Sequence, residues 1–320
     1  MALLEIESLK VHYPVRGAWP GRKRFVRAVD DVSLTIDDGE IVGLVGESGC
    51  GKSSLGRAIV RLEEPAGGTI RLRGIDLATL RGARLRAARR DFQMIFQDPY
   101  GSLNPRLTIF AALDEVLRLH GPRDRAARRA EAERLMELVG LDRSLLDRYP
   151  HQFSGGQRQR IGIARALAPK PRLIVADEPV SALDVSVQVQ IINLLEAIRR
   201  DTGAAFLFIA HDLAVVEHIS DRILVMYLGH IVESGPSHEV CADPRHPYTR
   251  ALLSAVPTVE PSGRKRIILA GDVPSPLAPP PGCPFHPRCP LADDRCRARR
   301  PESVAFGNGR QVACFHAGGR

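Results

Sequence analysis

Apolar residues along this chain follow two patterns that predict two kinds of β-strand. Short continuous apolar runs bounded by glycine or polar residues predict strands buried on both faces, and they occupy residues 40–45, 94–96, 173–176 and 205–209. Alternation of apolar and polar residues predicts strands with one exposed face, as at residues 3–11 and 32–36. Further strands are expected at 69–73 and in a hairpin of 222–226 and 230–234 that turns at Leu228 and Gly229.

Helical spacing of apolar residues separates these strands and predicts an α/β fold. Helices are expected at residues 54–61, 107–120, 125–139, 158–167, 185–200 and 251–256. Residues from about 98 to 168 are interpreted as an inserted helical subdomain. Residues 14–27 are expected to form a loop or hairpin, and the proline-dense residues 274–287 an extended, irregular segment. A shift toward Pro, Arg and Cys near Gly235 predicts a first domain of residues 1–235 and a second of 236–320.

The segment from 46 to 53 fits the phosphate-loop pattern G-x-x-x-x-G-K-S/T. Its residues are Gly46, Glu47, Ser48, Gly49, Cys50, Gly51, Lys52 and Ser53. A predicted strand precedes it and a predicted helix follows, so loop N–H groups and the helix N-terminus would face the phosphates. Lys52 would reach the β- and γ-phosphates, and the Ser53 hydroxyl would bind Mg²⁺. The alternative is an ordinary glycine-rich turn of an α/β fold.

A second helix start has the features of a phosphate site. Ser154 is a suitable N-cap residue for the helix expected from Arg158 onward. Gly155 and Gly156 carry no side chains that would cover the first helical N–H groups, and Gln157 follows them.

Three ionisable residues follow predicted buried strands at their carboxyl ends, where α/β sheets place their chemistry. Asp177 and Glu178 follow residues 173–176. One carboxylate could hold Mg²⁺ through water, and the other could orient or deprotonate an attacking water; the alternative is a capped helix start before Pro179. His211 follows residues 205–209, where it could contact a γ-phosphate, although a lone histidine is usually structural.

Composition favours a globular chain of one large domain or two. Of the 320 residues, 44% are apolar and 26% charged. No apolar run approaches a membrane span and no signal-peptide core is present, so we expect a soluble, cytoplasmic chain that partners would hold at any membrane where it works. The net charge is +8, but the Arg-rich segments 81–90 and 123–134 alternate with Ala, Leu and acids. They are interpreted as solvated helix faces rather than a nucleic-acid or lipid patch, and 5% aromatic residues disfavour base stacking.

Four of the six cysteines gather near the C-terminus. They are Cys283, Cys289, Cys296 and Cys314. In a cytosolic chain this grouping suggests a metal site more than a disulfide framework. Four thiolates suit Zn²⁺ or an iron–sulfur cluster. Their spacing is not a C-x2-C zinc pattern, which weakens the zinc interpretation, and free or paired thiols are the third alternative.

Taken together, these motifs resemble the ATP-binding subunit of ABC transporters over nearly the whole chain. The phosphate loop, Gln97, the 154–157 signature, Asp177–Glu178, residues 181–184 and His211 occur in the order of that family. Residues 98–105, the sequence His246-Pro247-Tyr248 and the Pro/Cys-rich tail look like the dipeptide/oligopeptide (peptide/nickel) importer ATPases, closest to the second ATPase of dipeptide importers. The resemblance implies a P-loop ABC ATPase core with an antiparallel β subdomain, a helical subdomain and a small C-terminal extension. Phe153 stands where the family more often has Leu.

The resemblance also implies roles for individual residues. Glu178 looks like the general base, His211 like the γ-phosphate sensor and Asp184 like a residue at a dimer interface. The remaining assignments concern ATP and Mg²⁺. Tyr13 would stack on adenine, and Lys52, Ser54 and the loop amides would bind the phosphates. Ser53 and Gln97 would contact Mg²⁺ directly, and Asp177 would contact it through water. Gln97 would also couple to the membrane subunits. Tails of this kind are implied to hold a [4Fe–4S] cluster.

In this family two ATPase domains pair head to tail, so that the signature of one completes the ATP site of the other. The resemblance therefore implies a second ABC ATPase, favoured as a different chain, with two membrane permeases and an external solute-binding protein. The chain would be peripheral at the cytoplasmic face of the cell membrane and would power import of peptides or related solutes, with dipeptides, longer peptides, glutathione and nickel chelates all open. No nucleic-acid partner is expected.

Two alternatives come from other classes of protein. A soluble ABC-type ATPase acting on nucleic acid or ribosomes would usually carry two ATPase domains in one chain or a coiled-coil arm, and neither is seen. A regulatory subunit that only binds nucleotide is disfavoured by the intact acid, histidine and signature residues.

Overall fold

The chain folds as two units, each built from segments that are distant in sequence. The computed structural model describes residues 2–15, 24–98, 101–256 and 267–318. The first unit contains Asp37–Glu40 and Thr79–Leu207, and the second contains Ala2–Ile36, Ile41–Ala78 and Phe208–Arg320. Most of the loop predicted at 14–27, and two residues of the segment 98–105, lie outside the described residues.

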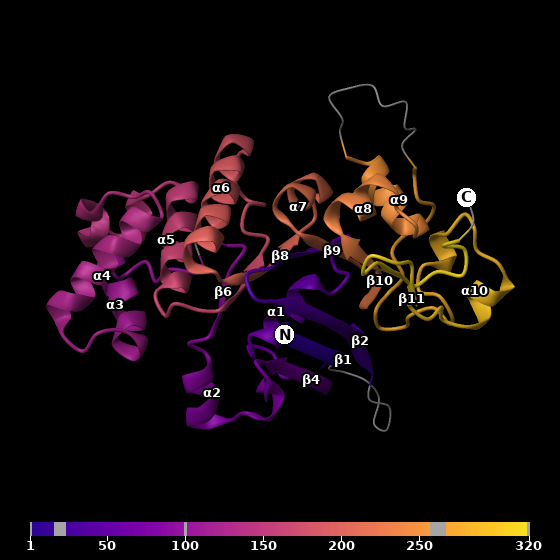
Figure 1. The fold of residues 1–320 in the computed structure, drawn as a ribbon, viewed down its shortest axis with the longest axis horizontal. Coiled ribbons are helices and arrows are strands. Elements are labelled where there is room, and N and C mark those ends of the chain that lie inside the picture. Colours follow the sequence, from indigo (N-terminus) through magenta and orange to yellow (C-terminus); the bar gives the residue numbers. More distant parts are fainter. Residues whose placement is uncertain (1, 16–23, 99–100, 257–266, 319–320) are drawn as a thin grey trace. The chain divides into compact units, whose positions relative to one another are not determined.

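An antiparallel sheet forms one part of the second unit (Figure 1). Its strands, in the order β2-β1-β4-β5, are β1 (Ala2–Pro14), β2 (Phe25–Asp37), β4 (Gly67–Leu72) and β5 (Ile75–Asp76). Leu4 lies opposite Leu72 and Ile6 opposite Ile70, and all four side chains are buried. The alternating pattern therefore predicted the buried face correctly. β2 starts seven residues before the prediction because residues 25–29 can continue the extended strand.

A second sheet in this unit carries the phosphate loop. The strands of this sheet that lie wholly in the second unit run in the order β11-β12-β10-β9-β3. They are β3 (Ile41–Val45), β9 (Arg222–Tyr227), β10 (His230–Pro236), β11 (Val304–Ala305) and β12 (Gln311–Val312). β3 pairs with β9 in parallel, and β9 and β10 form the predicted hairpin. Gly235 lies inside β10, and β12 from the C-terminal extension pairs with β10. C-terminal residues thus continue the sheet that holds the loop.

Five short helices lie among the described residues of the second unit. They are α1 (Lys52–Ile59), α7 (Leu213–Ile219), α8 (Ser237–Ala242), α9 (Pro247–Ser254) and α10 (Asp294–Ala298). Two single 3-10 turns are η1 (Leu77–Thr79), which ends at the start of the first unit, and η4 (His286–Arg288). α9 begins four residues before the prediction, because Pro247 occupies a first-turn position where its missing N–H costs nothing.

The first unit combines parallel strands with a helical insertion. In chain order its elements are α2 (Gly82–Ala88), β6 (Phe92–Ile95), α3 (Ile109–His120), α4 (Arg125–Leu138), η2 (Arg143–Asp147), η3 (Pro150–Gln152), α5 (Gly155–Leu167), β7 (Leu173–Asp177), α6 (Val185–Thr202) and β8 (Ala205–Ala210). β6 and β7 pair in parallel, and the chain passes into the second unit within β8. The described part of the chain contains no helix that combines the length and the apolar character needed to cross a membrane.

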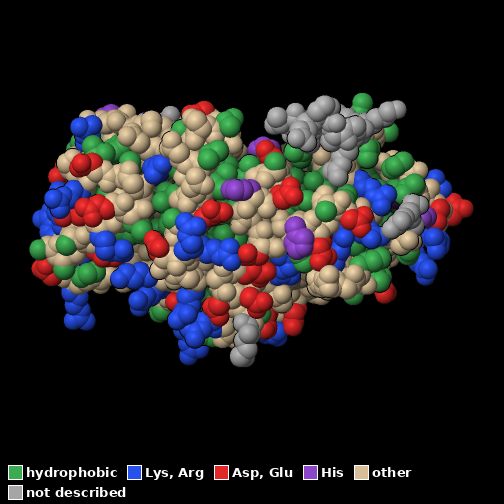
Figure 2. All heavy atoms as spheres, turned by 45° about the horizontal axis from the view of Figure 1, so that its top comes forward, with side chains coloured by type: hydrophobic (Ala, Val, Ile, Leu, Met, Phe, Trp, Pro, Cys, Tyr) green, Lys and Arg blue, Asp and Glu red, His purple; other side chains and the backbone are tan. Residues whose placement is uncertain are grey.

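The Arg-rich segments behave differently from one another. α2 contains no buried residue, so the expectation of a solvated face is confirmed there. In α4 it is wrong at Arg128, whose side chain is buried and pairs with Asp114 of α3 at 2.5 Å. Burial raises the pKa of Asp114, but hydrogen bonds from Arg128 and Arg118 outweigh it and leave the pKa lowered. On the face shown in Figure 2, Lys and Arg side chains lie among Asp and Glu side chains.

Candidate nucleotide and thiol sites

The phosphate loop closes around the ammonium group of Lys52. The loop connects β3 to α1, and Lys52 is the first residue of that helix. Its side chain is 4% exposed. Lys52 Nζ donates hydrogen bonds to the carbonyl oxygens of Gly46 at 2.7 Å and Glu47 at 3.2 Å. The loop thus holds its cation in place with weak neutral acceptors, which an anionic phosphate oxygen can replace.

Gly51 allows the backbone to turn sharply from the phosphate loop into α1. Its φ is +110°, and a Cβ atom there would lie 2.0 Å from the carbonyl oxygen of Ala28. Only glycine fits this position. Gly51 is also the N-cap residue of α1 and provides no side-chain cap, so the first helical N–H groups are not covered from that side.

Two further predicted residues lie in the second unit. The Tyr13 hydroxyl, on β1, donates a hydrogen bond to Ser54 Oγ in the first turn of α1 at 3.2 Å. This contact places the aromatic ring beside the loop helix, while its stacking on adenine stays a prediction. His211 directly follows β8 and is exposed, and the next residue, Asp212, caps α7 by accepting from the N–H of Ala214 at 2.9 Å.

In the first unit, Gln97 and Glu178 are brought together. They follow the adjacent parallel strands β6 and β7, so both lie beyond the same edge. Gln97 Nε2 donates to Glu178 Oε2 at 2.9 Å. Glu178 has φ +46°, a left-handed conformation uncommon for a residue with a side chain and often found at functional sites. Asp177, the last residue of β7, is 3% exposed. The Gln97–Glu178 hydrogen bond was not predicted from the sequence.

The predicted signature forms a capped helix start. Ser154 Oγ accepts from the N–H of Gln157 at 3.3 Å, and Gln157 Oε1 accepts from the N–H of Ser154 at 3.0 Å. This capping box confirms Ser154 as the N-cap of α5 and puts Gly155 and Gly156 in its first turn. A Cβ at Gly156 would lie 2.6 Å from Val187 Cγ1, so glycine also lets α5 lie close to α6.

Asp184 caps the neighbouring helix α6. Its carboxylate accepts from Ser186 Oγ at 2.7 Å and from the N–H of Val187 at 3.0 Å. The hydrogen bond from the Ser186 side chain, followed by that from the Val187 backbone, lowers the pKa of Asp184. The carboxylate is exposed and charged at neutral pH. Its location at a dimer interface remains a prediction.

The sequence His246-Pro247-Tyr248 has a structural meaning that the motif alone did not reveal. His246 Nδ1 accepts from the N–H of Tyr248 at 3.1 Å and so caps α9. Complete burial lowers the pKa of His246 to about 3, so the ring is neutral at physiological pH. The Tyr248 hydroxyl in turn accepts a 2.7 Å hydrogen bond from the backbone N–H of Glu47 in the phosphate loop.

Arg288 is a second contact to the loop that the sequence did not predict. Its guanidinium donates to both carboxylate oxygens of Glu47, at 2.6 and 3.1 Å. The two residues are 241 positions apart. The sequence contains only an indirect sign that Arg288 has a function, namely its position within the Cys-rich tail.

The four C-terminal cysteines lie in one region of the second unit as free thiols. The N–H of Cys283 donates to the carbonyl oxygen of Cys296 at 2.8 Å. Burial is the main cause that raises the pKa of Cys283 to about 11, and the nearby thiols of the other three cysteines raise it further. Burial likewise raises the pKa of the other three. These thiols are therefore protonated unless a cation lies beside them.

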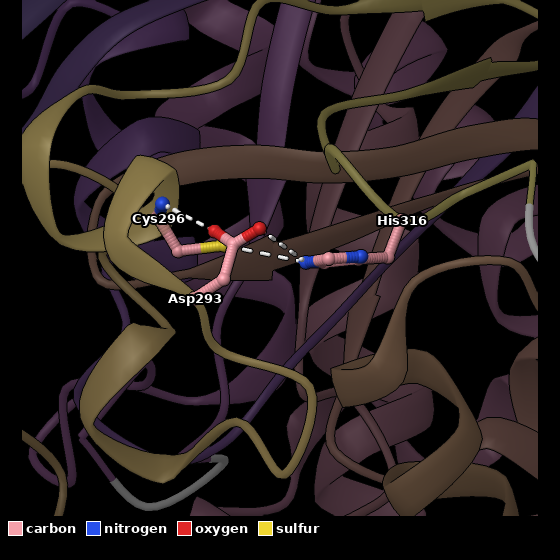
Figure 3. Close-up of side chains that lie close together, drawn as sticks. All are labelled: Asp293, Cys296 and His316. Atoms are coloured by element: carbon pink, nitrogen blue, oxygen red, sulfur yellow. Dashed lines mark hydrogen bonds and ion pairs between the residues drawn. The ribbon is translucent and has the colours of Figure 1, made fainter.

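Two non-cysteine side chains adjoin this group. Figure 3 shows Asp293, Cys296 and His316 pointing toward one another, with their donor atoms all within 4.8 Å. His316 Nε2 lies 3.7 Å from Cys296 Sγ and 3.5 Å from Asp293 Oδ2. Asp293 also caps α10 through the N–H of Cys296. The sequence did not predict Asp293 or His316 as ligands, because their spacing matches no metal motif.

The fold and the phosphate loop define a nucleotide-binding ATPase of the P-loop class. A family model described as ABC transporter matches residues 29–181. A second, described as oligopeptide/dipeptide transporter, C-terminal region, matches residues 232–296.

Relatives and solved structures agree with these two models. The chain is 54% identical to a probable peptide ABC transporter ATP-binding protein, y4tS, of Sinorhizobium fredii, over 98% of this chain and 89% of the relative. It is 49% identical to the oligopeptide transport ATP-binding protein AppF of Bacillus subtilis, over 98% and 96%. The ADP- and phosphate-bound ATP-binding cassette MJ0796 matches with a TM-score of 0.64 and 30% identity, over 73% of this chain and 98% of that one.

The chain therefore belongs to the ATP-binding proteins of ABC transporters, in their oligopeptide/dipeptide group. It is the ATPase of an ABC transporter. The predicted family and the predicted P-loop ABC fold are therefore confirmed.

Proposed function

We propose that this chain hydrolyses ATP to power the import of dipeptides or longer peptides through an ABC transporter. The observation that carries the proposal is the union, in one chain, of a phosphate loop closed around Lys52 with the C-terminal region that matches the oligopeptide/dipeptide transporters. Relatives named for peptide and oligopeptide transport support peptides as the solute class.

In the proposed reaction a water attacks the γ-phosphate of ATP. The loop amides, Lys52 and Ser54 in the first turn of α1 hold the phosphates. Tyr13 stacks on adenine, and His211 contacts the γ-phosphate. Glu178 orients and deprotonates the water, and the 2.9 Å hydrogen bond from Gln97 fixes the direction of its carboxylate.

We propose that Mg²⁺ is bound by the residues that the family resemblance predicts, which are Ser53, Gln97 and Asp177. Their hydroxyl, amide and carboxylate oxygens are the hard donors that Mg²⁺ prefers. Gln97 donates to Glu178 through its amide nitrogen, so its amide oxygen is the atom that suits a cation. When bound, Mg²⁺ neutralises charge on the β- and γ-phosphate oxygens.

The proposed assembly contains a second ABC ATPase, two permeases and an external solute-binding protein. The capped start of α5, with Ser154, Gly155 and Gly156, would face the ATP of a second ATPase, which we propose to be a different chain. Asp184 would lie at the interface between the two ATPases. The assembly would lie at the cytoplasmic face of the membrane, with this chain peripheral to it.

We place the permease contact on a groove in the first unit. The groove has a volume of about 460 Å³ and is lined by Gly101, Ser102, Leu103, Asn104, Pro105, Leu107, Ala112, Glu115 and Arg165. Arg165 donates to the Ser102 carbonyl oxygen at 2.5 Å and so fixes the loop. Because this loop follows Gln97 closely in sequence, a permease segment seated here could act on the Gln97–Glu178 pair.

Affinity purification of the chain from its native membranes tests the proposed assembly. We expect two multi-span permeases and a second ATPase to accompany it, and peptide uptake to require all of them. Uptake of a radiolabelled dipeptide and tripeptide, with a nickel chelate as a comparison solute, identifies the solute class. Recovery of ribosomal or DNA-bound partners without a permease would contradict the proposal.

For the thiol site we propose a [4Fe–4S] cluster on Cys283, Cys289, Cys296 and Cys314. The residues fit such a group, because four soft ligands lie in one region of the second unit, with Cys283 and Cys296 buried and Cys289 and Cys314 partly exposed. Anaerobically purified protein should carry about four iron atoms per chain, as the cluster formula requires. Cys289→Ser and Cys314→Ser should lose iron, whereas the control Cys241→Ser should retain it.

Zinc at Asp293, Cys296 and His316 is the competing occupant. His316→Ala separates the two, because it removes a zinc ligand and leaves all four thiols in place. Zinc that is lost in His316→Ala would overturn the cluster proposal, as would protein free of both metals by elemental analysis.

A further inference from the structure

Glu47, the second residue of the phosphate loop, is held by the C-terminal extension at two points. Its N–H donates to the Tyr248 hydroxyl at 2.7 Å. Its carboxylate receives both arms of the Arg288 guanidinium, at 2.6 and 3.1 Å. Backbone and side chain of one loop residue are thus fixed by two segments of the extension, α9 and η4.

Both anchors are rigidly supported. The Tyr248 ring is fully buried and packs against Tyr227 of β9, with ring centroids 4.7 Å apart, and against Phe285, at 5.4 Å. The Arg288 side chain is 8% exposed and lies three residues after Phe285. A two-armed, charge-assisted contact from a buried guanidinium is strong and geometrically specific, so the extension determines where Glu47 lies.

A short chain of contacts leads from Arg288 to the phosphate-binding cation. Arg288 pairs with the Glu47 carboxylate, and the Glu47 carbonyl oxygen accepts from Lys52 Nζ at 3.2 Å. Arg288 also neutralises a carboxylate that would otherwise repel an incoming triphosphate. Losing it would therefore loosen the loop and leave an uncompensated negative charge on it.

We propose that Arg288 and Tyr248 are positioning residues for ATP, through which the C-terminal extension holds the phosphate loop ready for the nucleotide. The extension is then part of the nucleotide site as well as the seat of the thiols. The inference rests on the proposed function only in that ATP binds this loop.

The first test is nucleotide binding by the full-length Arg288→Ala variant. With a fluorescent ATP analogue as the probe, we expect Kd to rise about tenfold, the size of effect when a charge-assisted contact is lost. In ATP turnover, KM should rise similarly while kcat changes less than about twofold, because the contact precedes the chemical step. Arg297→Ala is the matched control: Arg297 pairs with Asp294 on the surface of the same region and should leave Kd unchanged.

Two further variants keep the test decisive if Arg288→Ala is poorly folded. Tyr248→Phe retains the buried ring and removes only the oxygen that accepts from Glu47, so Kd should rise by a smaller factor. Glu47→Ala combined with Arg288→Ala should bind ATP no worse than Arg288→Ala alone, because the two side chains act through each other.

Unchanged Kd in Arg288→Ala and Tyr248→Phe would overturn the inference, as would losses that multiply in the double variant. Failure of the unaltered chain to bind ATP would instead contradict the proposed function, so the two failures are distinguishable.

Discussion

A chain carrying Glu178→Gln binds ATP as tightly as the unaltered protein and hydrolyses it about a thousandfold more slowly, within the range expected for loss of a general base. The amide has nearly the same size and can still accept the hydrogen bond that Gln97 donates to Glu178 at 2.9 Å. It cannot take a proton from water. The change therefore removes the chemical step and leaves the neighbouring structure in place.

Single-turnover hydrolysis of radiolabelled ATP, alongside a binding measurement, checks this result. Glu137→Gln is the matched control, because Glu137 is an exposed glutamate on α4 and its substitution should leave both quantities unchanged. If Glu178→Gln turned over ATP at a near-normal rate, another group would have to be the base and the role of Glu178 would be refuted.

Local sequence patterns were sufficient for the elements that position these residues. Residues 173–176 are apolar without interruption, and the structure has them as β7, fully buried, with Asp177 and Glu178 at its end. Ser154 was expected to cap a helix because its short hydroxyl side chain can accept from the backbone three residues later, and it does so. In both cases the interactions that decide the structure lie within a few residues of one another.

The missed features depend on pairs that are distant in sequence. Arg128 was predicted to lie on a solvated helix face, whereas in the structure it pairs with Asp114 of another helix. Glu47 was assigned only to the phosphate loop, and its partners in the C-terminal extension follow 201 and 241 positions later. No periodicity or motif connects such residues, because their proximity is created by the packing of whole elements. The same reason kept Asp293 and His316 out of the predicted metal ligands.

Lys52→Met should abolish useful affinity for ATP, raising Kd at least about a hundredfold, since a lost contact between opposite charges is worth about 3 kcal/mol. The substitution keeps most of the length of the side chain and removes its charge. Lys52 is buried, and its ammonium group donates to the neutral carbonyl oxygens of Gly46 and Glu47. An apolar replacement should therefore be tolerated, and thermal unfolding should show a folded protein.

Lys170→Met tests whether loss of any lysine has this effect. Its side chain is 69% exposed and lies 3.8 Å from Glu131, so we expect normal ATP binding. Unchanged Kd in Lys52→Met, measured on protein that melts cooperatively, would mean that the loop does not bind the triphosphate. That result would remove the basis for the roles of Arg288 and Tyr248 as well, because both act on ATP only through the loop that encloses Lys52.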